Sequence, residues 1–172
     1  MIINLLDLLT MIEVHTLSHK GKDFTYTVKS FSELSSEELY LLTKIRQEVF
    51  VVEQDCVFVD SDGYDLLAFH FILFDEGGQI AGYARILAKD TIYDKATIGR
   101  VLTTKAYRQT GLGREVFRLA LEALYQKLGR QAVKIQAQSY LLQFYESFGF
   151  KSMSEAYLDT GILHNDMIKA DA

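Results

Sequence analysis

The sequence predicts a single mixed α/β domain built around a central sheet. The length of 172 residues suits one domain, and a composition of 49% hydrophobic and 24% charged residues is that of an ordinary globular protein. Apolar patterns follow one another in the order β-α-β-β-β-α-β-α-β-β, without internal repeats. An antiparallel meander that leads into a β-α-β crossover predicts a mixed, mostly antiparallel sheet.

The first third of the chain contains one strand, one helix and an irregular segment. Residues 24–29 alternate between apolar and polar side chains, which predicts a strand. A helix begins at the capping box Ser35-Ser36-Glu37-Glu38, and its apolar residues recur at helical spacing as far as Val49. The segment 51–65 that follows is acidic and irregular.

The middle of the chain predicts the three strands of the meander. Residues 66–74 are almost all apolar, as in a strand buried on both faces. A turn at 76–79 leads into a returning strand at 80–88, and a second turn leads into a strand at 96–104.

The last third contains the crossover and a terminal hairpin. A long amphipathic helix is predicted at 111–128, followed by a strand at 132–138 and a short helix at 140–148. Residues 150–156 and 161–169 can form the hairpin that ends the chain.

Charge and composition exclude several classes of function. The formal net charge of −5 argues against nucleic-acid binding, and no apolar run is long enough to span a bilayer. The single cysteine, Cys56, favours a cytoplasmic protein. The four histidines show no metal-ligand spacing, so we expect no metal site. The apolar segment 1–12 is either a short helix or a stretch upstream of an alternative start at Met11.

The chemically most informative segment is 101–114, where a strand ends and a helix begins on Gly111-Leu112-Gly113. A helix N-terminus presents unpaired N–H groups and a positive dipole end, which bind phosphate. A dinucleotide-binding turn would carry a third glycine at position 116, where this chain has Val116, and no Walker A loop is present. The alternative is a glycine-rich helix start without a ligand.

Two motifs in order favour the ligand. Arg108-Gln109-Thr110-Gly111-Leu112-Gly113 resembles the signature of the GNAT superfamily of N-acetyltransferases, and 142–150 resembles its second motif, with a tyrosine before Gly-Phe. From about Thr43 onward the chain resembles the ElaA-type branch of that superfamily. The resemblance implies an N-terminal extension at 1–20 and one acetyltransferase domain at 21–172. It also implies a sheet of about six to seven strands flanked by helices and splayed at the cofactor cleft.

The resemblance further implies a site for acetyl-CoA between the splayed strands. The strand before the motif would offer backbone groups to the pantetheine and the acetyl carbonyl, with the Leu102 N–H at the developing oxyanion. The helix start would bind the pyrophosphate, with Arg108 adding a positive charge. The implied cofactor residues are Val101, Leu102, Thr103, Arg108, Gln109, Gly111, Leu112, Gly113 and Arg114.

The resemblance assigns protonation of the CoA thiolate to Tyr145, whose alternative role is that of a core aromatic. The amine must lose a proton before it attacks the thioester, but the strand 96–101 carries no carboxylate that could act as the base. The candidates for this base are the side chains of Glu48, Glu53, His70 and His164, or a chain of water molecules. A lone histidine such as His70 on an apolar strand is more often a satisfied core residue.

Arg85 and Arg100 are predicted to lie close to one another across two strands, where like charges repel. A carboxylate must lie between them, either from the acidic segment that begins at Glu53 or from a substrate. The candidate residues on the acceptor side are therefore Glu53, His70, Arg85 and Arg100. Charge reversal at Glu53 would prevent folding in the first case and would mainly raise the substrate KM in the second.

These features predict an enzyme that transfers an acetyl group from acetyl-CoA to a primary amine, which could be a small molecule, a peptide N-terminus or a lysine. The alternative is a GNAT-fold module that binds acyl-CoA as a sensor or partner without turnover. Members of the superfamily often dimerise, so a homodimer is possible, and the apolar N-terminal stretch could serve as its contact.

Overall fold

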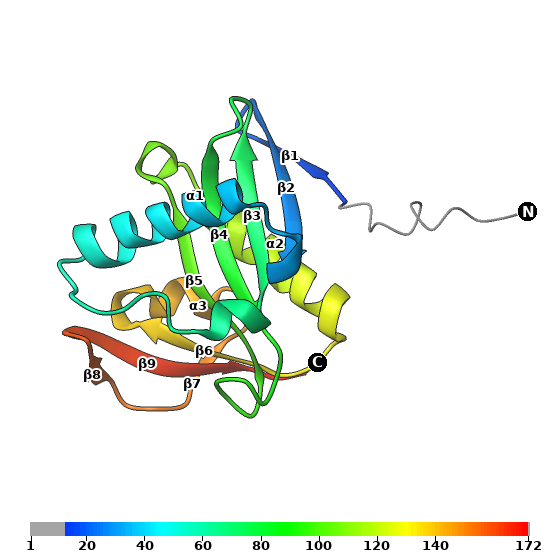
Figure 1. The fold of residues 1–172 in the computed structure, drawn as a ribbon. Helices are drawn as coiled ribbons and strands as arrows, with labels where there is room; N and C mark the ends of the chain where they lie inside the picture. The colour runs from blue at the N-terminus through cyan, green and yellow to red at the C-terminus, as the bar shows by residue number, and fades with distance from the viewer. Residues whose placement is uncertain (1–12, 172) are drawn as a thin grey trace, which may run out of the picture.

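A nine-stranded sheet forms the centre of the described chain, residues 13–171 of a computed structural model (Figure 1). Its strands are β1 (His15–His19), β2 (Lys22–Ser30), β3 (Phe69–Asp75), β4 (Ile80–Leu87), β5 (Ala96–Thr103), β6 (Val133–Gln138), β7 (Lys151–Ser152), β8 (Tyr157–Asp159) and β9 (Ile162–Lys169). The helices are α1 (Ser36–Arg46), α2 (Leu112–Leu128) and α3 (Leu142–Glu146). A π-helical segment, η2 (Gln47–Glu53), continues α1.

The sheet has the order β1-β2-β3-β4-β5-β6-β9-β7, and β8 pairs with the remaining length of β9. All neighbouring strands are antiparallel except β5 and β6, which α2 connects as a parallel crossover. The predicted mixed, mostly antiparallel sheet is confirmed. It contains more strands than the six to seven expected because β1, β7 and β8 are too short to show a clear alternating pattern.

Helices cover both faces of the sheet, so β3 and β4 are buried on both sides (Figure 1). Phe71 and Leu73 belong to the core with α2, whereas Ile72 belongs to a second core with Leu42 of α1. This division follows from the two-residue period of a strand, which sends successive side chains to opposite faces. The continuous apolar run therefore predicts the central position of β3 correctly.

Four sequence-based boundaries differ from the structure. Leu66 and Leu67 lie in an exposed 3₁₀ turn, and β3 begins at Phe69. Regular α1 ends at Arg46, and its apolar periodicity continues through η2. The predicted boundary after residue 20 falls in the β1–β2 turn, so residues 15–19 belong to the sheet. In the predicted terminal hairpin, β9 pairs with both β7 and β8. The alternatives for residues 1–12 lie outside the described chain.

Candidate active site between β5 and β6

The two parallel strands at the centre of the sheet separate soon after they meet. Only Ala96 and Thr97 of β5 pair with β6, opposite Val133 and Lys134. A shift in the β4–β5 register lies between Tyr83 and Arg85, and Arg100 has a positive φ of 52°. Such a bulge bends its strand. The edge of β5 from residue 98 onward is therefore open toward β6, which confirms the predicted splay.

A cavity of about 810 Å³ occupies this opening, a volume typical of small-molecule sites. The open edge of β5 contributes three predicted cofactor residues, Val101, Leu102 and Thr103. Arg108, from the loop before α2, lines the same cavity. Further walls come from η2, the following acidic segment, α3 and the β8–β9 hairpin.

The N-cap of α2, Gly111, follows three residues after Arg108 and has a φ of 86°. Gly111 has no side chain to cap the helix, and the Thr110 hydroxyl accepts from the Leu112 N–H at 3.3 Å. Around Gly113 the nearest atom to an added Cβ would be a Thr103 methyl at 3.8 Å, so the approach to the backbone is open. His19 of β1 donates from Nε2 to the Thr110 carbonyl at 3.0 Å and fixes the preceding loop. This arrangement fits a phosphate group bound by the N–H groups of the first turn.

The remaining predicted cofactor residues lie beside the cavity without lining it. Gln109 has a φ of 60° and leads into the helix, and Leu112 is fully buried. The Arg114 side chain instead donates to the Ser147 hydroxyl at 2.6 Å and lies over the ring of Phe148. It thereby ties the first motif to the second, and the Arg114 N–H donates to the Gly111 carbonyl at 3.0 Å.

Tyr145 of α3 is both a core aromatic and a cavity residue. Its ring packs edge-on against Phe117 and Phe144, with 5.0 Å between ring centres in each pair. The residue is only 9% exposed, yet it lines the cavity with Leu102. Burial raises the pKa of the Tyr145 phenol well above its usual range. The phenol therefore stays protonated at neutral pH and can donate a proton.

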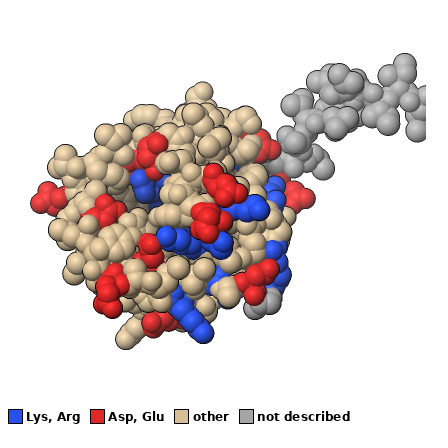
Figure 2. All heavy atoms as spheres, turned by 90° about the horizontal axis from the view of Figure 1, so that it is seen from below, with Lys and Arg blue, Asp and Glu red and all other residues tan. Residues whose placement is uncertain are grey.

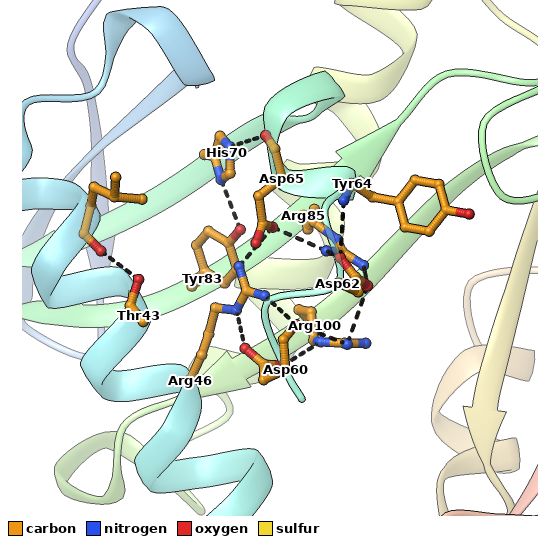
Figure 3. Close-up of polar contacts among 11 residues, drawn as sticks. Thr43, Arg46, Asp60, Asp62, Tyr64, Asp65, His70, Tyr83, Arg85 and Arg100 are labelled. Carbon is orange, nitrogen blue, oxygen red and sulfur yellow. Dashed lines mark hydrogen bonds and ion pairs between the residues drawn. The ribbon is translucent and has the colours of Figure 1, made fainter. Parts of the chain in front are cut away.

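One wall of the cavity carries a cluster of three arginines and three aspartates (Figure 3). We call it the Arg–Asp cluster, formed by Arg46, Arg85, Arg100, Asp60, Asp62 and Asp65. Arg85 contacts both oxygens of Asp62, at 2.6 and 2.7 Å. Arg46 donates to Asp60 and Asp65, at 2.7 Å each, and Arg100 donates to Asp60 at 2.6 Å. Every guanidinium group in the cluster therefore contacts at least one carboxylate.

The aspartates of the Arg–Asp cluster are the carboxylates that were expected between Arg85 and Arg100. The register places Arg85 opposite Gly99, so the bulge moves Arg100 one residue away from a directly opposed position. The carboxylates come from the acidic segment of the chain itself, as one of the two alternatives expected. Burial alone would raise the pKa of Asp62, but its hydrogen bonds with Arg85 outweigh this effect and hold that pKa below its usual range. Burial likewise opposes ionisation of Asp65, whose pKa the bonds from Arg46 lower.

Sequence reasoning missed Arg46, which is 4% exposed. The available signal was its spacing, because Arg46 lies four residues after Leu42 on the buried side of α1. A charged residue in an apolar stripe requires a partner, and four aspartates lie in the next twenty residues.

His70 and Glu53 occupy positions different from that of the cluster arginines. His70 is 1% exposed, does not line the cavity, and bonds through Nδ1 to the Tyr83 hydroxyl and through Nε2 to the Asp65 carbonyl. Burial lowers the pKa of His70, so it is a neutral core histidine. Glu53 does line the cavity, where it forms a half-exposed ion pair with Arg108 at 2.6 Å.

A different wall of the cavity comes from β6, β8 and β9 and carries Gln136, Asp159 and His164, which we call the hairpin wall. Gln136 donates to one oxygen of Asp159 at 2.9 Å. The Nδ1 of His164 bonds to the carbonyl of Ile162 at 2.9 Å. Among these residues only His164 was considered in the sequence, as one of four candidate bases.

Residues 13–171 lack two features that metal binding and membrane crossing by a helix would require. That part of the chain contains no group of three or more histidine, cysteine or acidic side chains placed to hold a metal ion. None of its helices has the length and hydropathy needed to cross a membrane. Figure 2 shows acidic and basic side chains intermixed on one face of the molecule.

Comparisons with known proteins agree with this geometry. A family model described as an acetyltransferase (GNAT) domain matches residues 65–170. Protein ElaA of Escherichia coli is 38% identical over 139 residues, which cover 80% of this chain and 91% of that protein. The crystal structure of E. coli ElaA aligns with a TM-score of 0.79 at 34% identity, over 85% of this chain and 99% of the other.

A second solved structure, an acyl-CoA N-acyltransferase from Pseudomonas aeruginosa, aligns with a TM-score of 0.80 at 36% identity. The alignment covers 86% of this chain and 99% of that one. The family resemblance noted in the two sequence motifs is thus confirmed by a family model, by sequence and by structure. The chain belongs to the GNAT acetyltransferase family, in its ElaA-type branch.

Proposed function

We propose that the protein transfers an acetyl group from acetyl-CoA to the nitrogen of a primary amine. Membership of the GNAT family supports an acyl-CoA N-acyltransferase. The observation that carries the proposal is that Tyr145 and the open edge of β5 line one cavity with Arg108, which lies three residues before the N-cap of α2. A proton donor and a strand edge for the acyl group therefore line the same cavity, and the proposed phosphate site lies beside it.

The start of α2, the open edge of β5 and Tyr145 have separate roles in the proposed reaction. The first turn of α2 binds the pyrophosphate of the donor, whose thioester supplies the activated acyl group. The open edge of β5 at Leu102 holds the thioester carbonyl and stabilises negative charge on its oxygen as the amine attacks. Tyr145 donates its phenolic proton to the departing sulfur.

The charges around the cavity support a cationic acceptor. The arginines that line it, Arg85, Arg100 and Arg108, each have a carboxylate partner from the chain. The charges of these arginines are therefore balanced within the chain. Asp159 has no cationic side chain within 4 Å among the residues that the structure describes. An ammonium group on the acceptor complements this remaining negative charge.

The test is release of CoA thiol from acetyl-CoA in the presence of a panel of primary amines, namely an alkylamine, phenethylamine, a peptide with a free N-terminus and a peptide with an internal lysine. We expect amine-dependent release that falls by about 10²-fold or more in Tyr145→Phe. The substitution keeps the ring and its packing, so the thermal unfolding temperature should change little. Longer acyl-CoA donors in the same assay define the acyl specificity.

Two outcomes would contradict the proposal. Amine-dependent release that is equal in the wild type and in Tyr145→Phe would remove the tyrosine from the reaction. Binding of acetyl-CoA without release for any amine would favour the alternative, a module that binds acyl-CoA without turnover.

A further inference from the structure

The hairpin wall contains a histidine whose protonation pattern is fixed by a backbone bond. A carbonyl oxygen can only accept a hydrogen bond, so the contact with Ile162 places the hydrogen of neutral His164 on Nδ1. Its Nε2 then carries a lone pair. No side chain or backbone group in residues 13–171 bonds to that nitrogen, and His164 lines the cavity. The other cavity-lining candidate base, Glu53, is engaged by Arg108.

The position of His164 complements that of Tyr145. In β6, Ile135 and Ala137 point into the core that contains Tyr145, and Gln136 and Gln138 alternate with them. His164 is paired with Gln138 in the register of β9. Because paired residues project to the same face, His164 lies on the face of β6 opposite to the core. An acyl group between β5 and β6 is therefore reached by Tyr145 from one face and by His164 from the other.

Asp159 lies on the same face of the hairpin as His164. Asp159 pairs with Ile162, and His164 is two residues further along β9, which makes the two side chains diagonal neighbours. Such neighbours lie roughly 7–8 Å apart, which leaves room for one small cationic group between their side chains. Gln136 orients one oxygen of Asp159 and leaves the second available.

From this juxtaposition we propose that His164 is the base that takes the proton from the acceptor, and that Asp159 binds the acceptor as an ammonium ion beside it. The inference rests on the proposed function and names the acceptor subsite of the same cavity. The acceptor class is a primary amine that arrives protonated, because the unpaired oxygen of Asp159 complements an ammonium group.

The protons balance in this scheme. The ammonium gives one proton to Nε2 of His164, and the freed nitrogen lone pair forms the C–N bond with the thioester carbon. The C–S bond then breaks, its electron pair goes to sulfur, and the sulfur takes the Tyr145 proton. The nitrogen loses its second proton to the Tyr145 phenolate as it becomes an amide. His164 finally releases its proton to solvent.

The experiment measures kcat/KM against pH with acetyl-CoA and the most active amine of the panel. We expect an ascending limb in the wild type, because only the unprotonated form of the base can take the proton from the ammonium. In His164→Gln, activity at pH 7 should fall by about 10²-fold or more, and the limb should move to the alkaline range where the amine deprotonates by itself. The ionisable groups around His164 that this substitution leaves in place are Tyr157, Asp159, Asp166, Cys56 and Glu53.

The matched control is His15→Gln on β1, which lies outside the cavity and should keep both the rate and the limb. An unchanged pH profile in His164→Gln, with an active wild type, would overturn the assignment of the base and leave the proposed function intact. An inactive wild type would instead overturn the proposed function itself.

Two further measurements separate the base from a merely structural role. Nitrogen-15 NMR of neutral His164 should show the hydrogen on Nδ1, and a hydrogen on Nε2 would contradict the proposal.

Asp159→Asn should raise the KM for the amine about tenfold with little change in kcat, because it removes the charge that binds the ammonium. The control Asp90→Asn lies outside the cavity at a φ of 64°, which asparagine also tolerates, and should leave the KM unchanged. An unchanged KM in Asp159→Asn would exclude that contact.

Discussion

Two walls of one cavity carry ionisable side chains, and they differ in whether those side chains have partners. In the Arg–Asp cluster, every arginine contacts a carboxylate from the acidic segment. In the hairpin wall, Nε2 of His164 and one oxygen of Asp159 have no partner among residues 13–171. The charges of the first wall are paired within the chain, although Nε of Arg85 has no hydrogen-bond partner among the described residues. The second wall retains a carboxylate oxygen and an imidazole nitrogen that a cationic substrate can contact.

The largest effect should come from the Arg–Asp cluster, in Arg46→Ala. The substitution removes a buried cation that contacts both Asp60 and Asp65 and leaves each of them with one arginine, and the loss of one partner from a buried ion pair destabilises proteins by about 3–5 kcal/mol. Urea unfolding measures the change. The control is Lys44→Ala, whose exposed pair with Glu48 should contribute less than about 0.5 kcal/mol. A loss below about 1 kcal/mol for Arg46→Ala would show that the cluster does not support the fold.

A smaller effect should appear in acid. The pKa values of Asp62 and Asp65 are below their usual range in the folded protein, so these carboxylates bind fewer protons when folded than when unfolded. Their contribution is fully present above the unfolded pKa of about 3.9 and is lost as the pH falls through the lower folded values. Urea unfolding of the wild type at pH 3 to 6 should show stability falling below about pH 4. Asp62→Asn should flatten this fall, and an equal slope in both proteins would contradict the assignment.

The smallest effect should come from charge reversal at Glu53. This change was expected to prevent folding if the Glu53 carboxylate lay between Arg85 and Arg100. Glu53 instead forms a half-exposed pair with Arg108, outside the cluster. Glu53→Lys should therefore lower the free energy of unfolding by only about 1 kcal/mol or less. Thermal unfolding checks this value. A protein that fails to fold would show that Glu53 belongs with the buried wall after all.

The sequence was most informative where a local pattern determines a local structure. The capping box at Ser35 begins α1 as predicted, with the Ser35 side chain accepting from the Glu38 N–H. The predicted cofactor strand 101–103 and Tyr145 line one cavity, because motifs on neighbouring elements preserve their spacing in the fold.

The acceptor side was predicted less well because its residues meet only through the fold. Arg46 and Arg85 are brought to the same aspartate, Asp65, by a helix and a strand that are far apart in the chain. The availability of His164 depends on a bond to the Ile162 carbonyl, which no residue pattern encodes. His70 and His164 are both strand histidines, and only the structure separates a core residue from a cavity residue.

The most direct test of the acyl-CoA site is thermal unfolding of the wild type and Gly113→Glu with and without acetyl-CoA. Gly113 has room for a side chain, and a glutamate in the first turn of α2 favours the helix dipole, so the variant should fold at least as stably. Acetyl-CoA at 100 times its Kd should stabilise the wild type by about 2.7 kcal/mol, a shift of roughly 2–4 °C for each kcal/mol. We predict this shift in the wild type and its loss in Gly113→Glu. An equal shift in both proteins would contradict the placement of the phosphates at α2, and no shift in either would contradict the acyl-CoA site.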